Sequence, residues 1–480
     1  MKNKIIDLLA AQIEGMSKED ISATIEIPPK PEMGDFAFPC FRLAKTMHKA
    51  PNMIAADIKE AIGDVDYLDR IEVKGAYLNF FVKTEVFVKS MIEAANSENF
   101  GGSDIGEGKN ICLDYSSPNV AKNFHVGHLR TTIIGNSLYK IFSKLGYNAI
   151  RINHLGDWGT QFGKLIVAYK AWGSKEAVEK DGISELMKLY VKFHEEADKN
   201  PELVDEARAW FAKMEQGDEE ALSIWQWFKD ISLVEYKRTY DLLGVDFDYY
   251  LGESFYRDKC QEVVDKITEA GLLKESEGAM IVDLSEYDMA PCIITKKDGS
   301  SIYATRDLAA IFYRKKTYNF CKCLYVTGQE QKLHFAQVFK VVELLGNEWA
   351  KDQLVHIPYG LVSLEGAKLS TRNGNIIYAE DILHDAIEKS LEIITEKSPN
   401  LENKEEVAKM VGVGSVLFND LYNQRIKDVS FSWDKVLNFD GETGPYVQYT
   451  HARCSSVVRL AENFDPSNEV DFSVITEPDA

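Results

Sequence analysis

The sequence predicts an α/β protein: a domain with a parallel sheet, preceded by a small α+β module and followed by an α-helical region. Three observations predict this order. From about residue 109, short apolar runs alternate with helical patterns, which is typical of a parallel sheet. Glycines between residues 101 and 108 indicate a linker before that region. From about residue 380, apolar residues recur at helical spacing.

The first hundred residues alternate helical patterns with short extended runs. Prolines and a glycine predict a loop over residues 28–35. The expected helices cover residues 5–13, 52–62 and 84–95, and the clearest strand covers residues 77–82.

The central region has four short apolar runs that predict buried strands, over residues 110–115, 148–153, 321–327 and 354–362. Charged helical patterns over residues 175–240 interrupt this alternation and are interpreted as an insertion. A solvated helical elaboration without chemistry is the favoured interpretation, because charged helix faces usually meet water. Three further helices are expected near the end of the chain, over residues 382–396, 407–421 and 446–462.

Composition limits the possible partners and compartments. The formal net charge is −21, which by itself argues against nucleic acid unless a local basic patch exists. No apolar run approaches the ~18 residues of a membrane span, and the N-terminus does not resemble a secretory signal. A cytoplasmic protein without a membrane partner is expected. Seven scattered cysteines, of which only Cys321 and Cys323 are close, predict reduced thiols rather than a zinc site.

The most informative segment, residues 116–130, joins a predicted strand to a predicted helix. His125 and His128 lie three apart at the helix start, close to Lys122 and Gly127. The free N–H groups and dipole of a helix N-terminus favour phosphate, to which histidine and lysine can donate hydrogen bonds. Glycine allows a ligand to approach the backbone closely. The sequence therefore predicts a phosphate site here; the alternative is that both histidines are structural caps or core residues.

Other polar segments are weaker signals. Residues 368–375 form a basic, glycine-flanked loop that could close over the same phosphates, or simply be a solvated turn. Residues 153–163 follow the second predicted strand, where α/β sheets bind ligands, although Asp157 could merely cap a helix. Asp307 could likewise cap a helix, and Gln331 could be a surface residue.

Taken together, these segments resemble the arginyl-tRNA synthetases, a family of class I aminoacyl-tRNA synthetases. His125-Val126-Gly127-His128 is similar to the HIGH motif of class I, and residues 368–372 resemble the KMSKS loop. Four longer segments narrow the resemblance to the arginine-specific family: residues 116–130, 153–163, 303–307 and 444–453. The resemblance runs over essentially the whole chain.

The resemblance implies a Rossmann-like catalytic domain that activates L-arginine with ATP and transfers it to the 3′ end of its tRNA. Mg²⁺ is expected to accompany ATP, without a structural metal. By resemblance, a set of polar residues holds ATP, while Lys368 and Ser370 close over it; the set is Lys122, His125, Gly127, His128, Lys368, Ser370 and Arg372.

An arginine pocket needs carboxylates, because the guanidinium group is always charged and presents a planar fork of donors. The family's pocket maps onto Asp114, Asn119, Tyr303, Asp307 and Gln331. Tyr303 and Asp307 are expected at the guanidinium side, and Asp114 and Asn119 nearer the α-amino and carboxylate end. Position 114 often carries Glu in the family.

The resemblance also implies a domain plan. Residues 31–39 match a segment of the family's N-terminal tRNA-contacting domain, and tRNA is expected to be needed for arginine activation. The expected domains are 1–105 (tRNA-contacting), 106–380 (catalytic, with the 175–240 insertion), 381–438 (helical stem) and 439–480 (start of an anticodon-binding domain). The family continues beyond that point, so a truncated chain is expected; the alternative is a naturally short protein with reduced anticodon contact. A monomer is also expected.

Two residues depart from the family pattern, Thr371 and Asn373, which stand where relatives carry lysine. Arg372 is expected to supply the missing charge. A local basic face for tRNA is expected from Lys122, Arg130, Lys368 and Arg372. The competing functions are a shorter HxGH nucleotidyltransferase, which would not need residues 1–100, and a synthetase paralogue that binds tRNA without charging it.

Overall fold

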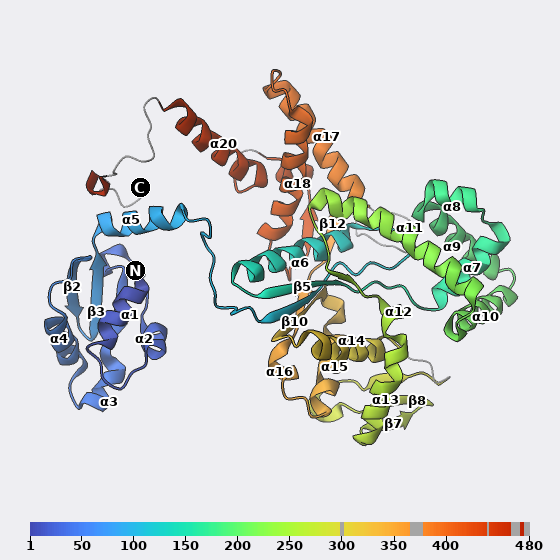
Figure 1. Ribbon diagram of the computed structural model, residues 1–480, viewed down its shortest axis with the longest axis horizontal. Helices are drawn as coiled ribbons and strands as arrows, with labels where there is room; N and C mark the ends of the chain where they lie inside the picture. Colours follow the sequence, from blue (N-terminus) through green and yellow to red (C-terminus); the bar gives the residue numbers. More distant parts are fainter. Residues whose placement is uncertain (298–301, 365–377, 439–440, 462–470, 475–480) are drawn as a thin grey trace. The chain divides into compact units, whose positions relative to one another are not determined.

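A computed structural model describes residues 1–480 except for 298–301, 365–377, 439–440, 462–470 and 475–480 (Figure 1). The chain divides into two compact units. The first unit comprises residues 1–101 with 463–480, and the second comprises residues 102–462. Within the described ranges, no helix is both long and apolar enough to cross a membrane.

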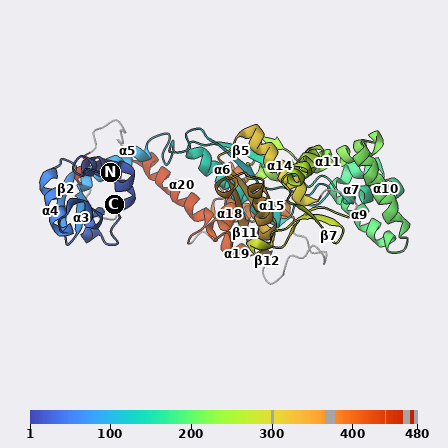
Figure 2. The same cartoon turned by 90° about the horizontal axis from the view of Figure 1, so that it is seen from below.

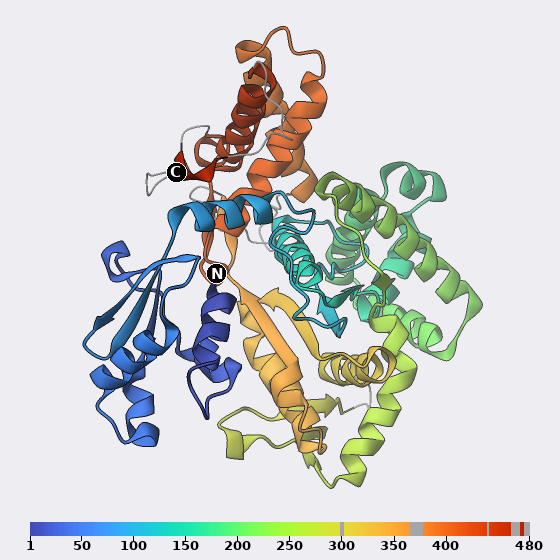
Figure 3. The same ribbon diagram turned by 60° about the vertical axis from the view of Figure 1, so that its left-hand side comes forward.

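The first unit is built on a three-stranded antiparallel sheet in the order β1-β3-β2. Helix α4 packs on β2 and β3 (Figure 3). Apolar side chains of the helix and the sheet, such as Ile54, Phe38 and Phe80, share one hydrophobic core. The expected strand at residues 77–82 is confirmed as β3. The sequence pattern missed β2, because a bulge between Leu68 and Arg70 breaks its period-two alternation. The elements are α1 (Lys2–Ala10), α2 (Lys18–Thr24), β1 (Phe36–Pro39), α3 (Ala44–Met47), α4 (Pro51–Ile62), β2 (Leu68–Lys74), β3 (Tyr77–Val82) and α5 (Thr84–Ala95).

The second unit contains a five-stranded, fully parallel sheet in the order β11-β10-β4-β5-β6. The prediction of a parallel sheet is therefore confirmed. The strands are β4 (Asn110–Asp114), β5 (Asn148–Asn153), β6 (Tyr249–Tyr250), β10 (Lys322–Gly328) and β11 (Leu354–Tyr359). Four of them match the predicted runs, whereas β6 has only two residues and leaves no recognisable pattern.

Both faces of this sheet are buried. Ile111 and Leu113 of β4 point into one hydrophobic core, with α6 (Val126–Lys144), while Cys112 points into a second core on the other face. Burial on both faces makes parallel strands read as apolar runs, which is why the sequence pattern located them. The second core is closed by α13 (Cys260–Glu269), α14 (Tyr303–Tyr318) and α15 (Lys332–Leu344).

A group of helices lies between β5 and β6 in the sequence and has its own hydrophobic core, which includes Phe162, Phe193 and Phe228. Figure 2 shows α7, α9 and α10 gathered at one end of the second unit. The helices expected over residues 175–240 are confirmed as α8 (Lys175–Asp181), α9 (Ile183–Ala197), α10 (Glu202–Gln216) and α11 (Glu219–Leu243). They follow α7 (Thr160–Trp172).

The rest of the second unit contains a small antiparallel sheet and the C-terminal helices. The small sheet and the short helix before it are β7 (Leu273–Ser276), β8 (Ala279–Val282), β9 (Cys292–Thr295) and α12 (Glu253–Tyr256). A parallel pair joins β12 (Val362–Leu364) to β13 (Val429–Phe431). The predicted helical region is confirmed as α17 (Ala379–Lys397), α18 (Lys404–Tyr422), α19 (Trp433–Val436) and α20 (Gly444–Leu460), with α16 (Ala350–Gln353) before β11.

Candidate active site

The segment after β4 is tightly folded at the carboxyl edge of the sheet. Ser116, Ser117 and Ala121 adopt left-handed backbone conformations, with φ of 71°, 47° and 60°. Such conformations in non-glycine residues cost of order 1–3 kcal/mol each and persist only where the surroundings hold them. The Ser116 hydroxyl is held by the hydroxyls of Tyr240 at 2.7 Å and Thr132 at 2.8 Å. Strain of this kind is typical of functional loops.

Helix α11 of the inserted helical group holds the same segment from outside. The Tyr236 hydroxyl lies 2.7 Å from the carbonyl oxygens of both Asn119 and Lys122. The Ala121 N–H donates to Ser232 Oγ at 2.9 Å. The interpretation of these helices as a merely solvated elaboration is therefore wrong for α11, which supports the loop before the two histidines.

His125 and His128 cap the N-terminus of α6 through one ring nitrogen each. Nδ1 of His125 accepts from the Gly127 N–H at 3.1 Å, and Nδ1 of His128 accepts from the His125 N–H at 3.2 Å. A backbone N–H can only donate, so each neutral ring must carry its proton on Nε2. The two rings stack with centroids 3.9 Å apart. Capping thus leaves two N–H donors available at the helix terminus.

Electrostatics keep these rings uncharged. Burial, reinforced by the charge of Lys122, lowers the pKa of His125. Burial lowers the pKa of His128 well below its usual value, with further lowering by His125 and Lys122. Near neutral pH both residues are therefore uncharged donors beside a helix N-terminus, while the exposed Lys122 is the nearby cation. Helix capping and phosphate binding by these histidines are therefore compatible, because capping uses Nδ1 of each ring and phosphate binding would use Nε2.

Arg130 does not belong to an exposed basic face. Its side chain is 1% exposed, and its guanidinium donates to the carbonyl oxygens of Leu361 at 3.3 Å and Arg425 at 3.1 Å. Its Nε lies 3.5 Å from Asp420 Oδ1 on α18. The expectation that Arg130 contributes to tRNA binding is wrong: the residue joins α6 to the chain before β12 and to α18.

Asp114, at the end of β4, already has an ion-pair partner and a hydrogen-bond donor within the protein. Its Oδ2 lies 2.7 Å from Nη1 of the fully buried Arg314, and its Oδ1 accepts from Ser117 Oγ at 2.9 Å. Arg314 Nη2 is 3.1 Å from His154 Nδ1. The sequence pattern missed Arg314, because two lysines follow it and such a run is typical of a solvated helix end.

The loop after β5 carries a second buried carboxylate, Asp157, which is inaccessible to solvent. Its Oδ2 lies 2.6 Å from Lys229 Nζ, and its two oxygens accept from the N–H and hydroxyl of Ser254. Gly159 occupies the N-cap position of α7, so the alternative that Asp157 caps this helix is wrong. Asp157 accepts instead from the first turn of α12. In the same loop, Gly156 faces the exposed residue Asn119, whose Oδ1 would lie 2.2 Å from an added Cβ.

Glu253, at the start of α12, is a charged residue that sequence reasoning missed. It is 8% exposed and lies 2.7 Å from Arg306 Nη1. Burial raises the pKa of Glu253 to about 7; Asp307 and Asp157 raise it further, and Arg306 opposes them. Glu253 therefore lies close enough to both Asp307 and Asp157 to interact with them electrostatically.

Asp307 is the fifth residue of α14, so it lies inside the helix and does not cap it. Its Oδ2 lies 2.6 Å from Nε2 of His334, in the first turn of α15. Tyr303 begins α14 one turn earlier and is 66% exposed. Gln331 is exposed and ends a short turn after β10, three residues before His334. The carboxyl edge of the sheet thus brings Asp114, the Asp307 region and the His125–His128 pair onto one side of the unit.

Three expected phosphate-binding residues, Lys368, Ser370 and Arg372, lie outside the described residues. The chain that follows them is hydrogen-bonded to the loop between β4 and α6, residues 115–125, which we call the histidine loop. Asn123 Nδ2 donates to the Tyr378 hydroxyl at 3.3 Å, and the Ala379 N–H donates to the Phe124 carbonyl at 2.9 Å.

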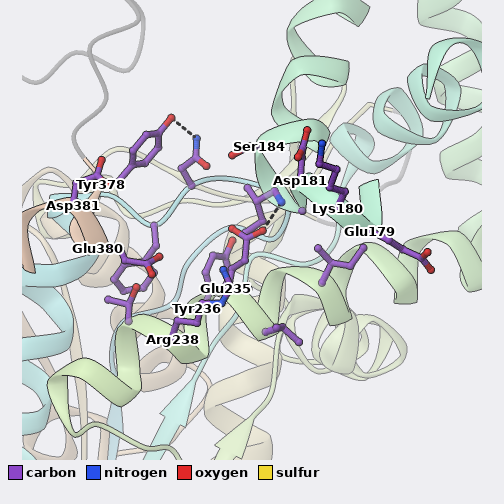
Figure 4. A pocket seen from close by; sticks show the side chains of 17 residues that line it. Glu179, Lys180, Asp181, Ser184, Glu235, Tyr236, Arg238, Tyr378, Glu380 and Asp381 are labelled. Carbon is purple, nitrogen blue, oxygen red and sulfur yellow. Dashed lines mark hydrogen bonds between the residues drawn. The ribbon is translucent and has the colours of Figure 1, made fainter. Parts of the chain in front are cut away.

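A cavity of about 530 Å³ lies beside this attachment, between the histidine loop, α8, α9, α11 and α17 (Figure 4). Among its charged groups, acidic residues outnumber basic ones, and burial raises the pKa of Glu235. An acidic lining disfavours phosphate, so we do not assign this cavity to ATP. The charged residues are Glu179, Lys180, Asp181, Glu235, Arg238, Glu380 and Asp381.

In the part of the chain that the structure describes, no three His, Cys, Asp or Glu side chains converge to hold a metal ion.

Comparison with known protein families gives two matches that together cover most of the chain. The family model described as "tRNA synthetases class I (R), catalytic domain" matches residues 91–433. The model described as "Arginyl tRNA synthetase N terminal domain" matches residues 3–82.

Curated relatives are similar over nearly the full chain. The arginine–tRNA ligase of Alkaliphilus metalliredigens is 59% identical over 96% of this chain and 82% of its own length. That of Clostridioides difficile is 55% identical over 100% of this chain and 85% of its own length.

Solved structures are similar in fold. An arginyl-tRNA synthetase from Thermus thermophilus has a TM-score of 0.79, with 22% identity over 100% of this chain and 84% of the other. One from Plasmodium falciparum has a TM-score of 0.76, with 24% identity over 96% of this chain and 81% of the other.

Proposed function

The chain belongs to the class I arginyl-tRNA synthetases, and we propose from its site how it performs the reaction of that family. It is an arginine–tRNA ligase: it activates L-arginine with ATP to arginyl-adenylate and transfers the arginyl group to the 3′ end of its tRNA. In the first step, a carboxylate oxygen of arginine attacks the α-phosphorus of ATP, and pyrophosphate leaves. In the second, a ribose hydroxyl of tRNA attacks the activated carbonyl, and AMP leaves.

The observation that carries the proposal is the use of the two histidine rings. Nδ1 of each ring is occupied by a backbone N–H, which leaves Nε2–H of His125 and His128 to donate to phosphate oxygens. Charge develops on these oxygens as pyrophosphate leaves, and fixed donors stabilise it without reorganising. Gly127 allows ATP to approach the helix terminus, and Lys122 adds a flexible cation. We assign Lys368, Ser370 and Arg372 to the opposite side of the phosphates, and Mg²⁺ bound to ATP would supply further positive charge.

The arginine substrate is assigned to the carboxyl edge of the sheet. Asp307 and Tyr303, one helical turn apart on α14, are proposed to receive the guanidinium, with Gln331 beside them. Asn119 is proposed to receive the α-amino and carboxylate end. Asp114 acts there through the oxygens that Arg314 and Ser117 hold in place.

The proposal also includes the domain plan and the partners. We assign residues 1–105 and 439–480 to tRNA contact, residues 106–380 to catalysis and residues 381–438 to a helical stem. We propose a cytoplasmic monomer, in keeping with a role in protein synthesis.

Two variants test this division of labour. His128→Ala should mainly lower kcat of arginylation, because its donor acts on charge that develops in the transition state. Asp307→Asn should mainly raise the KM for arginine, because it removes the charge that pairs with the guanidinium. Steady-state arginylation with arginine and ATP varied in turn measures both. The assignment is wrong if the two effects are exchanged.

A further inference from the structure

Four carboxylates gather at the carboxyl edge of the sheet: Asp114, Asp157, Glu253 and Asp307. They come from the end of β4, the loop after β5, α12 and α14. Their mutual proximity shows in the residues between them. Asp114, Asp307 and Asp157 each raise the pKa of His154 against the larger lowering by burial, while Asp307 and Asp157 raise that of Glu253. The site is therefore strongly negative unless nearby cations neutralise it.

Three of these carboxylates are paired with permanent cations. Asp114 lies 2.7 Å from Arg314, Asp157 lies 2.6 Å from Lys229, and Glu253 lies 2.7 Å from Arg306. Each pair is largely buried, with carboxylate side chains 0–11% exposed. These ion pairs leave little net charge at their positions to attract a cationic substrate.

Asp307 differs from the other three in both partner and exposure. Its ion-pair partner in the described ranges is His334, at 2.6 Å, and its side chain is 22% exposed. Histidine can donate a hydrogen bond while carrying no charge, which lysine and arginine cannot do at neutral pH. In the same ranges, the second oxygen of Asp307 has no hydrogen-bond partner. Asp307 is thus the accessible carboxylate of the four, and its partner need not neutralise it.

The ring of His334 is held in place for this contact. It lies edge-on to Phe335 with centroids 5.3 Å apart, and Phe335 stacks on His356 at 5.0 Å. His356 is in turn 2.9 Å from the hydroxyl of Thr327 on β10. The orientation of His334 is therefore tied to the sheet through packed rings.

We propose that His334 is a positioning residue: it is an uncharged hydrogen-bond donor that holds Asp307 in place, so that the carboxylate of Asp307 keeps its charge for the guanidinium of arginine. This inference rests on the proposed role of Asp307. The hydrogen bond orients one oxygen and directs the other toward the substrate. A permanent cation at position 334 would orient Asp307 equally well, but it would compete with the guanidinium for the same charge.

Three substitutions separate orientation from charge. His334→Gln keeps an uncharged donor, His334→Lys supplies a charged one, and His334→Ala supplies none. Leu333→Lys is the matched control, because it adds a cation at the neighbouring position, where the side chain is 51% exposed. Asp307→Asn is measured in parallel to test the role of Asp307 itself.

Arginine affinity is measured by calorimetry with tRNA present, and the KM values for arginine and ATP by arginylation at pH 8. His334→Lys should raise the arginine KM and Kd roughly 10- to 100-fold, the range expected for a hydrogen bond to a charged group. His334→Ala should raise them about tenfold, and His334→Gln and Leu333→Lys less than about threefold. The ATP KM should be unchanged in all four, which a general loss of structure would not produce.

Three results would overturn the inference. If His334→Lys leaves arginine binding unchanged while Asp307→Asn weakens it, charge at position 334 does not matter. If His334→Gln is as impaired as His334→Ala, an uncharged donor is not what Asp307 requires. If Asp307→Asn itself leaves arginine binding unchanged, the proposed pocket is wrong and the inference fails with it.

Discussion

Removal of Arg130 should destabilise the second unit mainly because the buried carboxylate of Asp420 loses its ion-pair partner. The carbonyl oxygens of Leu361 and Arg425 each also accept a backbone N–H, so they stay partnered in Arg130→Met. Asp420 is different: it is 9% exposed, and its Oδ2 has no hydrogen-bond partner among the described residues. Burial raises the pKa of Asp420 from 3.8 to about 6, against the opposing charge of Arg130.

The size of the effect follows from this pKa. A carboxyl group whose pKa is higher in the folded protein than in the unfolded chain lowers the stability of the fold. This loss of stability grows as pH rises from the unfolded pKa to the folded pKa, and it is constant at higher pH. For Asp420 the folded value is about 6, and the penalty at neutral pH is about 3 kcal/mol, at about 1.4 kcal/mol per pH unit.

Without Arg130 the pKa of Asp420 rises further, because the charge that lowers it is gone. Once this pKa exceeds 7.5, the penalty at pH 7.5 reaches about 5 kcal/mol, whereas at pH 5 it barely changes because the folded carboxyl is already mostly protonated. Arg130→Met should therefore cost about 2 kcal/mol more at pH 7.5 than at pH 5. The lost packing of the long arginine side chain adds a further destabilisation that does not depend on pH.

Urea unfolding followed by circular dichroism at both pH values measures this difference. The double variant Arg130→Met with Asp420→Leu is the control, because it replaces the pair by apolar groups and removes the titrating carboxyl. It should show no extra loss at pH 7.5 and should be more stable there than Arg130→Met alone. Equal destabilisation by Arg130→Met at both pH values, or a double variant no more stable than the single one, would refute the reasoning.

Two further predictions concern substrates. Gly156→Ala should raise the KM for arginine and leave the KM for ATP unchanged, because the added Cβ would lie only 2.2 Å from Asn119 Oδ1 and would displace that side chain. Equal changes in both KM values would contradict a role of Asn119 in the arginine pocket. Affinity for tRNA should fall steeply between about 50 and 200 mM salt in spite of the net charge of −21, because phosphate contacts release counterions. Filter binding measures this, and a flat salt dependence would argue against tRNA contact through basic side chains.

The sequence predicted those parts of the fold whose signal is local. The strands β4 and β10 are buried on both faces and β5 and β11 are at least half-buried along most of their length, so the four stand out as apolar runs between helical patterns. The strand β2 was missed because a bulge shifts its alternation, and β6 because its two residues cannot form a pattern. Pairing order within the sheet depends on contacts between distant segments and was not predictable from local patterns.

The candidate site divides in the same way. The two histidines were found because a helix start, a glycine and a lysine lie beside them in the sequence. Arg130 lies two residues further on and was misassigned, since nothing local distinguishes an exposed arginine from one whose partners, Asp420 and Arg425, are almost 300 residues away. Local sequence also gave no sign that α11 supports the histidine loop.

The same reasoning applies to the proposed arginine pocket, whose residues the sequence predicts but whose ion-pair partners it does not. An aspartate in a motif shows that a carboxylate is present, but the charge it offers to a substrate depends on its partner. Asp114 and Asp307 look equivalent in the sequence, and folding gives one a buried arginine and the other a histidine. In the proposed pocket, selection for a cationic substrate is therefore a property of the pairing, since a permanent cation beside Asp307 would leave every motif intact and still remove its charge.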